Sequence, residues 1–218
     1  MKTSDNTHIS EIDRFVYPAT STMIDRYVLA SHWTKGKKVL DAATGYGYGA
    51  GIVQSLGANG VVGIDIDNDA IDDANKRFDS KRCSFKTCDI FNLKDSFEKN
   101  SFEVCLSIET FEHLPPERID EYLQSIKSMT KETLVITTPK RKTPVWEYNG
   151  GTHLYEYDPT EFTDILGRNF EDWDISGFGI VEVPIQTSGM GSIDKQWGST
   201  LVADLNQAWI MVAVVTKE

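Results

Sequence analysis

The sequence has little of what marks a disulfide-stabilised or zinc-binding protein. Only three cysteines occur in 218 residues, Cys83, Cys88 and Cys105, and none belongs to a C-x-x-C pair. An odd number of cysteines without that spacing argues against both a disulfide framework and a cysteine zinc site. Cys105 lies within an apolar run, so we expect it to be a buried thiol.

Long apolar runs and positive net charge are also missing. No stretch approaches the roughly 20 apolar residues that cross a bilayer. Residues 1–11 are polar and carry acids, so we expect no signal peptide, no membrane partner and a cytoplasmic location. Lys and Arg total 22 against 33 Asp and Glu, which gives a formal net charge of -11. Such a surface repels phosphate backbones and disfavours nucleic acid as a partner.

Apolar runs alternate with helical patterns from Lys37 onward, and a hydrophobic content of 40% is enough for a packed core. The predicted strands cover 38–41, 61–65, 84–89, 102–108, 133–137, 172–180 and 208–216. The predicted helices cover 48–54, 69–78, 116–129 and 158–166. This alternation predicts a Rossmann-like α/β sheet of seven mostly parallel strands, with an antiparallel last strand and helices on both faces. In such sheets ligands bind at the carboxyl ends of the strands.

The organisation that we expect is a single domain over 1–218, with an N-terminal helical cap over 1–34 and a core over 35–218. Met23, Tyr27 and Ala30 have helical spacing, and a helix there either packs on the sheet edge or caps a ligand pocket. Residues 183–202 are rich in Gly, Ser and Thr, which predicts a long loop that is mobile over the site.

The most informative motif is a strand that ends in an acid and continues into a loop with alternating glycines, V-L-D-A-A-T-G-Y-G-Y-G over 39–49. Gly45, Gly47 and Gly49 remove side chains where the backbone turns sharply and meets a ligand. The dinucleotide fingerprint can be fitted to Gly45, Gly47 and Ala50, so a nicotinamide enzyme is one alternative. A tight turn without a ligand is another.

Three acidic residues help to distinguish between these kinds of ligand site. Asp65 ends the second strand, eighteen residues after Gly47, where a carboxylate accepts from both ribose hydroxyls. Asp41 lies four residues before Gly45, where it would repel a pyrophosphate but attract an ammonium group. Asp89 follows the third strand, where it can accept from an adenine amino group. Together they favour an adenosine cofactor with a positive, phosphate-free end.

This arrangement of Asp41, Gly45, Gly47, Asp65 and Asp89 resembles class I S-adenosylmethionine-dependent methyltransferases over roughly 27–170. The resemblance implies that the glycine loop faces the methionine part, that Asp65 holds the ribose, and that Asp89 and its neighbour hold the adenine. The cofactor residues that we predict are Asp41, Ala43, Gly45, Gly47, Asp65, Ile66, Asp89, Ile90, Ser107 and Glu109. The chain departs from the family pattern at Ala43, because the family often has the first glycine of the loop at this position.

The segment 107–114, S-I-E-T-F-E-H-L, is similar to the S-x-E-x-x-E-H-L segment of small-molecule and sugar-associated methyltransferases. The resemblance places 107–109 beside the methionine moiety. Glu109, Glu112 and His113 offer metal ligands, but hydrogen bonds of a loop and cap explain Glu112 and His113 more simply. We therefore predict no metal site.

A later segment supplies the candidate base. The T-P end of the fifth strand, followed by H-x-x-E at 153–156, again resembles methyltransferases that tailor glycans and natural products. An alcohol acceptor must lose its proton, a task that suits a histidine. His153 is the first candidate for this catalytic role and His113 the second. An amine or phosphate acceptor needs no base, in which case His153 only orients the substrate.

Lys140, Arg141 and Lys142 form the one basic run of an acidic chain. They are either a solvated face or contacts for an anionic acceptor such as a phosphate, nucleotide sugar or carboxylate. The substrate-binding residues that we predict are Lys140, Arg141 and Tyr155. The aromatic residues Trp146, Tyr148, Tyr155 and Tyr157 either stack on the acceptor or form the core of the loop.

These patterns predict an S-adenosylmethionine-dependent methyltransferase that acts on a small-molecule or sugar-linked acceptor, with oxygen favoured over nitrogen. The alternatives are a protein or RNA methyltransferase and a non-catalytic regulator that binds an adenosine cofactor.

Overall fold

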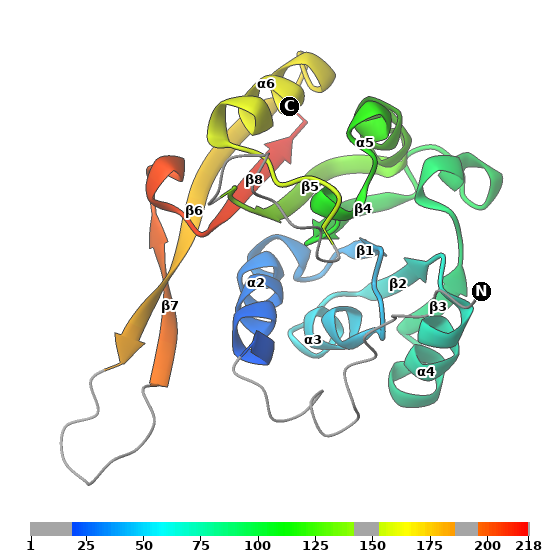
Figure 1. The fold of residues 1–218 in the computed structure, drawn as a ribbon. Helices are drawn as coiled ribbons and strands as arrows, with labels where there is room; N and C mark the ends of the chain where they lie inside the picture. The colour runs from blue at the N-terminus through cyan, green and yellow to red at the C-terminus, as the bar shows by residue number, and fades with distance from the viewer. Residues whose placement is uncertain (1–18, 142–152, 186–195, 218) are drawn as a thin grey trace, which may run out of the picture.

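The structure is a computed structural model that describes residues 19–141, 153–185 and 196–217. At its centre lies an eight-stranded sheet in the order β3-β2-β1-β4-β5-β8-β6-β7 (Figure 1). The strands are β1 Lys38–Ala42, β2 Gly60–Asp65, β3 Cys83–Thr87, β4 Phe102–Ile108, β5 Thr130–Pro139, β6 Asp174–Ile185, β7 Gln196–Val202 and β8 Ile210–Thr216. The strands from β3 to β5 are parallel, whereas β8 is antiparallel to β5 and β6. The predicted α/β class with an antiparallel last strand is confirmed.

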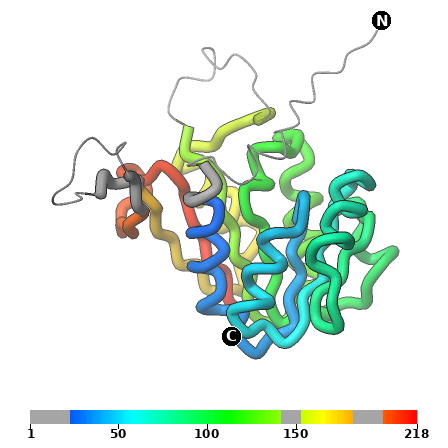
Figure 2. Tube along the Cα trace, turned by 90° about the horizontal axis from the view of Figure 1, so that it is seen from below, coloured from blue at the N-terminus to red at the C-terminus, as the bar shows by residue number. Residues whose placement is uncertain are grey.

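Helices cover both faces of the sheet. The α-helices are α2 Ala19–Thr34, α3 Tyr48–Ser55, α4 Asn68–Phe78, α5 Ile119–Met129 and α6 Pro159–Asn169. The 3-10 helices are η1 Ile90–Asp95, η2 Phe111–His113, η3 Pro116–Arg118 and η5 Leu205–Gln207. Figure 2 shows α2, α3 and α4 side by side across one face, and α5 and α6 lie on the other face in Figure 1.

Alternate residues of the central strands divide between two apolar cores. In β4, Val104 and Leu106 pack into the core beneath α2, α3 and α4, whereas Cys105 between them packs into the core beneath α5 and α6. Successive side chains of a strand point to opposite faces, and burial on both faces explains why these strands are continuous apolar runs in the sequence. Burial raises the pKa of the Cys105 thiol to about 12, so this cysteine is the buried thiol that we predicted.

The eighth strand, β7, lies within the segment 183–202 that we predicted as a loop. β6 continues to Ile185, and β7 pairs with it in antiparallel register. The loop prediction and the count of seven strands are therefore wrong, although 186–195 lie outside the described residues. An edge strand is held by backbone hydrogen bonds to a single neighbour, so it does not need the β-branched and apolar residues that mark a buried strand. The Gly and Ser residues of β7 therefore gave no strand signal.

The N-terminal helix α2 packs against the sheet, whereas none of its described residues lines the pocket at the strand ends, so its role as a cap stays a prediction. Tyr27 and Ala30 are buried in the core against the sheet, and Arg26 forms an ion pair with Glu109 after β4. Within the described ranges, no helix combines the length and the apolar character that crossing a bilayer requires.

Candidate functional site

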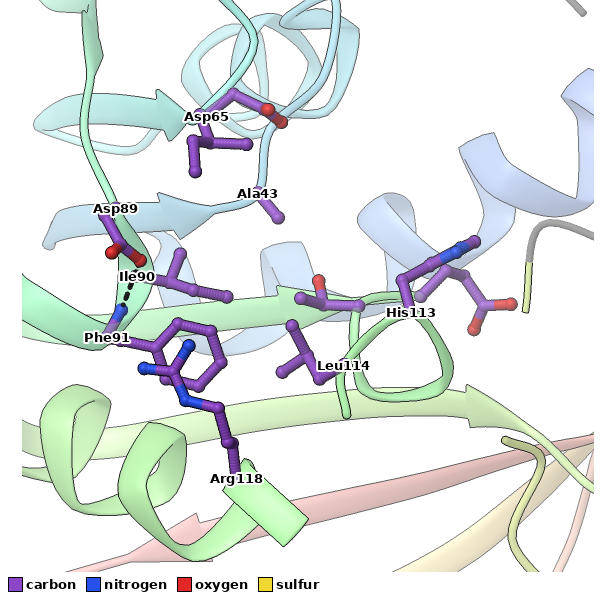
Figure 3. Close-up of a pocket in the computed structure, with 11 residues that line it drawn as sticks. Ala43, Asp65, Asp89, Ile90, Phe91, His113, Leu114 and Arg118 are labelled. Atoms are coloured by element: carbon purple, nitrogen blue, oxygen red, sulfur yellow. Dashed lines mark hydrogen bonds between the residues drawn. The ribbon is translucent and has the colours of Figure 1, made fainter. Parts of the chain in front are cut away.

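A pocket of about 490 Å³ opens at the carboxyl ends of β1, β2 and β4 (Figure 3). In a mostly parallel sheet this is the edge where ligands bind. The residues that line it are Ala43, Asp65, Ile66, Asp89, Ile90, Phe91, Glu109, Thr110, His113, Leu114 and Arg118. Figure 3 shows Asp65 and Asp89 toward one side of this group and His113 on the other.

The glycine loop lies between β1 and α3, and its backbone turns through left-handed conformations. Ala43, Gly45 and Gly47 have φ angles of 60°, 54° and 83°. An L-residue in this region costs roughly 1 kcal/mol. Glycine would adopt the backbone conformation of Ala43 with less strain. This explains why class I methyltransferases, which the sequence resembles, often have glycine at this position. Its methyl group lines the pocket.

Two of the three glycines are required by packing inside the protein. A Cβ added at Gly47 would lie 2.7 Å from the Cβ of Ala74 and 2.7 Å from the ring of Phe85. A Cβ added at Gly49 would lie 1.9 Å from the ring of Tyr27. Packing inside the protein alone thus requires glycine at these two positions, and close approach of a ligand to the loop stays a prediction. A Cβ at Gly45 would meet nothing within 4 Å, so this glycine is explained by its φ angle.

Asp65, at the end of β2, is held by the backbone around it. Its Oδ2 accepts from the N–H of Gly45 at 2.8 Å, and its Oδ1 accepts from the N–H of Asp67 at 3.0 Å. An ionised carboxylate has about four acceptor sites, so both oxygens retain acceptor capacity. The adjacent Ile66 is 72% exposed. The geometry thus fixes a carboxylate at the pocket that can still accept from two hydroxyls.

Asp89 caps η1, with its Oδ1 accepting from the N–H of Phe91 at 2.9 Å (Figure 3). The Arg118 guanidinium lies over the Phe91 ring, 3.6 Å from its centroid. Ile90 and Leu114 complete an apolar lining between these polar groups. Phe91, Thr110, Leu114 and Arg118 line the pocket but were not predicted from the sequence. The available signal was their position in the loops that follow β3 and β4 and beside Pro115 and Pro116.

Four predicted cofactor residues do not line the pocket, namely Gly45 and Gly47 of the loop, Asp41 and Ser107. Asp41 is fully buried, and its carboxylate accepts from the hydroxyls of Tyr27 at 3.2 Å and Thr44 at 2.5 Å. Burial raises its pKa to about 7, so the expected direct contact with an ammonium group is replaced by support of the loop. Ser107 is also fully buried, and its Oγ accepts from the Tyr122 hydroxyl at 2.6 Å.

Glu109 lies where β4 ends, with a φ of 51°. Its carboxylate accepts from the Thr137 hydroxyl at 2.8 Å and lies 3.3 Å from the Arg26 guanidinium. Burial raises the pKa of Glu109, while Arg26 opposes that shift. A left-handed non-glycine residue that holds an ion pair beside a pocket is typical of a functional site.

Glu112 lies deeper and is only 1% exposed. Its Oε2 accepts from the Thr138 hydroxyl at 2.9 Å, whereas its Oε1 has no hydrogen-bond partner. Burial raises the pKa of this carboxyl to about 8, and Glu109 adds to that shift. The Glu112 carbonyl accepts from the N–H groups of Leu154 and Tyr155, which attaches that distant segment to η2.

The two candidate bases lie side by side. The rings of His113 and His153 pack edge to face with centroids 5.0 Å apart, and His113 lines the pocket. His153 Nδ1 lies 2.8 Å from Glu156 Oε1, which leaves Nε2 for another partner. Glu112, His113 and His153 each bring one ligand atom to within 4.8 Å of the others.

The predicted substrate residues after β5 bind the protein itself. Arg141 lies 2.7 Å from Asp158 and 3.0 Å from Glu161 at the start of α6, and it donates to the Tyr155 hydroxyl at 2.9 Å. Lys140 donates to the backbone carbonyl of Asn206. The pocket lining includes none of Lys140, Arg141 and Tyr155. The remaining positions that we considered, Lys142, Trp146 and Tyr148, lie outside the described residues.

Residues 39–133 match a protein family described as a methyltransferase domain. None of the curated proteins that were compared matches the chain. Several solved structures that resemble it are described as methyltransferases, but at 20% identity or less they show the fold alone. A SAM-dependent methyltransferase from Archaeoglobus fulgidus is 20% identical with a TM-score of 0.64, and the similarity covers 91% of this chain and 93% of that one.

Two further structures extend the comparison. A possible histamine N-methyltransferase from Thermotoga maritima is 13% identical with a TM-score of 0.70 and 96% of each chain covered. Magnesium protoporphyrin IX methyltransferase from Synechocystis PCC 6803, with bound S-adenosylhomocysteine, is 16% identical with a TM-score of 0.64. The similarity covers 100% of this chain and 90% of that one.

The chain has the fold of S-adenosylmethionine-dependent methyltransferases, and residues 39–133 match the methyltransferase domain family. This stretch includes the glycine loop and every residue that lines the pocket. The predicted enzyme class and cofactor are confirmed at this level.

Proposed function

We propose that the protein transfers the methyl group of S-adenosylmethionine to an oxygen of a small-molecule or sugar-linked acceptor. The proposal is supported by one observation, which is that the pocket has two chemically different sides. Asp65 and Asp89 present acceptors on one side, and His113, with His153 beside it, lies on the other.

The residues present fit an adenosine cofactor. Asp65 keeps acceptor capacity for two ribose hydroxyls, because its present partners take one site on each oxygen. Asp89 and Ile90 line the adjoining part, where the flat Phe91 ring and apolar side chains suit an adenine. Ala43 and Gly45 would face the methionine part, and Glu109 would lie beside it. Asp41 would act indirectly by holding Thr44 in the loop.

When bound, the cofactor supplies a methyl group activated by its sulfonium. The protein must then hold the acceptor and take its proton. Glu156 accepts from Nδ1 of His153 in the tautomer that leaves Nε2 basic, the same orientation by a carboxylate that supports histidine bases elsewhere. This orientation suits His153 to accept the proton of an acceptor hydroxyl, and His113 is the neighbouring group that lines the pocket.

An oxygen acceptor is favoured because an alcohol must lose a proton, and two imidazoles adjoin the pocket for that task. The names of two solved relatives, one for a magnesium porphyrin and one for histamine as a possible substrate, support the small-molecule class. The sugar-linked option rests on the similarity of segment 107–114 to sugar-associated methyltransferases. Lys140 and Arg141 do not support an anionic acceptor, since protein groups engage them.

A labelled methyl group tests the proposal. The purified protein is incubated with methyl-labelled S-adenosylmethionine and separated small-molecule, protein and RNA fractions of a cell extract. We expect label in the small-molecule fraction, on an oxygen by mass spectrometry of the product. Label confined to protein or RNA would contradict the acceptor class, and absence of transfer despite cofactor binding would favour a regulator. Calorimetry should also show binding of S-adenosylhomocysteine and none of NAD⁺.

A further inference from the structure

A carboxylate and two imidazoles meet beside the pocket from two distant segments. Glu112 and His113 lie on η2, after β4, while His153 comes from the chain before α6. The N–H groups of Leu154 and Tyr155 donate to the Glu112 carbonyl at 2.7 and 3.1 Å, which fixes His153 next to η2. One ligand atom from each of the three side chains lies within 4.8 Å of the others. Ligands that share an ion at about 2.1 Å lie at most about 4.2 Å apart, so small side-chain adjustments suffice.

The Glu112 carboxylate has an unused buried oxygen. Its Oε2 is occupied by the Thr138 hydroxyl, but Oε1 has no hydrogen-bond partner although the side chain is 1% exposed. Burying a polar atom without a partner costs free energy, so such an atom requires an explanation. The Nε2 atom of His113 lies 3.9 Å from this oxygen. That separation is too long for a hydrogen bond and suits two ligands of one ion.

His153 has the surroundings of a metal ligand. Its Nδ1 is 2.8 Å from Glu156 Oε1, and among the residues that the structure describes no hydrogen-bond partner of Nε2 is found. Histidines that bind metals usually donate their other ring N–H to a carboxylate, which orients the ring and makes the ligand more basic. Glu156 would therefore be a positioning residue behind His153.

The charge around the cluster also favours a cation. Glu109, Glu112 and Glu156 bring three carboxyl groups to this region, and Arg26 forms an ion pair with Glu109. Within the part of the chain that the structure describes, no ion pair of Lys or Arg with Glu112 or Glu156 is found. A divalent cation would balance this group of acids.

We propose that Glu112, His113 and His153 bind a divalent first-row transition-metal ion at the acceptor side of the pocket. Two imidazole nitrogens and one carboxylate oxygen favour ions such as Zn²⁺, Co²⁺ or Fe²⁺ over Mg²⁺ and Ca²⁺, which prefer oxygen ligands. Three protein ligands leave at least one coordination position open, as in catalytic sites. This inference departs from our prediction of no metal site.

The role of the ion rests on the proposed O-methylation. In that reaction the acceptor oxygen bonds to the methyl carbon as the carbon–sulfur bond breaks, and the hydroxyl proton leaves to water. An ion bound to the acceptor oxygen lowers the pKa of its hydroxyl, so the proton leaves before or during transfer. His113 and His153 then act as ligands, and no histidine has to serve as the base.

Titration with Co²⁺ tests the site without any acceptor. The full-length protein, stripped of metal by a chelator, is titrated with Co²⁺ alone and followed by the visible absorption of imidazole-bound Co²⁺. We expect one ion per chain. The variants Glu112→Gln, His113→Gln and His153→Gln should each raise the Kd by at least about 10-fold, and Glu156→Gln should raise it by about 10-fold. His32→Gln, a histidine on α2 outside the cluster, is the matched control and should leave the Kd unchanged.

Circular dichroism of each variant shows whether it folds, and Glu112→Gln is chosen because its amide oxygen can still accept from Thr138. Equal Co²⁺ binding by the wild type and a folded His113→Gln/His153→Gln double variant would overturn the site, as would absence of binding by the wild type. Titration of the stripped protein with S-adenosylhomocysteine separately tests the cofactor site. A failure there would refute the proposed function, whereas a failure with Co²⁺ would refute only the metal.

Discussion

The two sides of the pocket are built in different ways. On the cofactor side, Asp65 and Asp89 are held by backbone N–H groups within a few residues of strand ends or of the glycine loop. On the acceptor side, the half-buried Glu109 and the buried Glu112 are held by side chains of β5, and His153 arrives from more than forty residues along the chain. The proposed cofactor side is thus built from local structure, whereas the proposed acceptor side is assembled from distant segments.

The largest effect is expected at His153. His153→Gln should lower kcat for methyl transfer by at least about 100-fold, because the variant loses either a general base or a metal ligand. Steady-state kinetics with the acceptor found by the labelling experiment measures this, with His32→Gln as a control that keeps full activity. A kcat within the range of the control would mean that the acceptor side lies elsewhere.

Addition of excess chelator then separates the two roles of this histidine. If His153 binds a metal, chelation should reduce the wild-type rate to nearly that of His153→Gln, and added Zn²⁺ or Co²⁺ should restore it. An unchanged rate after verified metal removal would assign His153 as a base.

Packing of the glycine loop predicts the next effect. Gly49→Ala should lower the free energy of unfolding by about 1–3 kcal/mol, because the new methyl group would overlap the Tyr27 ring. Gly45→Ala is the matched comparison, since its Cβ would meet nothing and only its φ of 54° adds cost, roughly 1 kcal/mol. Urea denaturation of both variants measures the difference. A larger loss at Gly45 would contradict the packing account.

The buried carboxyl of Asp41 gives the fold a pH dependence. Its pKa is raised from 3.8 to about 7 in the folded state, so the folded state binds an extra proton between these values. Its contribution to stability is therefore present at low pH and is lost as the pH rises toward 7. Asp41→Asn should be more stable relative to the wild type at pH 8 than at pH 5, as measured by urea denaturation. An equal difference at both pH values would show that Asp41 does not titrate in this window.

The smallest effect is expected at Ala43. Ala43→Gly should relieve the strain of its φ of 60° but give the unfolded chain more freedom, and these effects are each about 1 kcal/mol or less. We expect a change in unfolding free energy below about 1 kcal/mol, in contrast to the usual loss when glycine replaces alanine in a helix. Thermal unfolding measures it, and a loss clearly above that value would contradict the strained backbone.

Much of the fold could be predicted because burial on both faces leaves a strong sequence signal. Helix α6, predicted over 158–166, carries a separate local signal, since Asp158 caps it and Pro159 occupies its first position. Strand β7 was missed because an edge strand needs only backbone pairing with one neighbour, and its Gly and Ser residues resemble those of a loop.

The site was predictable only where its residues follow strand ends. Asp65 and Asp89 were placed at the pocket edge by that rule. Arg141 was misjudged because a run of positive charge does not show whether acids such as Asp158 and Glu161 will meet it in the fold. The contact of His153 with His113 depends on backbone hydrogen bonds between distant segments, for which the sequence carries no local pattern.

We propose that one pocket has a cofactor side at Asp65 and an acceptor side at His153. This division can be tested by calorimetric titration of S-adenosylhomocysteine into the wild type, Asp65→Ala and His153→Gln. Loss of two hydrogen bonds to a charged acceptor should weaken binding by Asp65→Ala at least about 10-fold, while His153→Gln should bind like the wild type. Unchanged affinity in Asp65→Ala, or a comparable loss in His153→Gln, would contradict the division of the pocket.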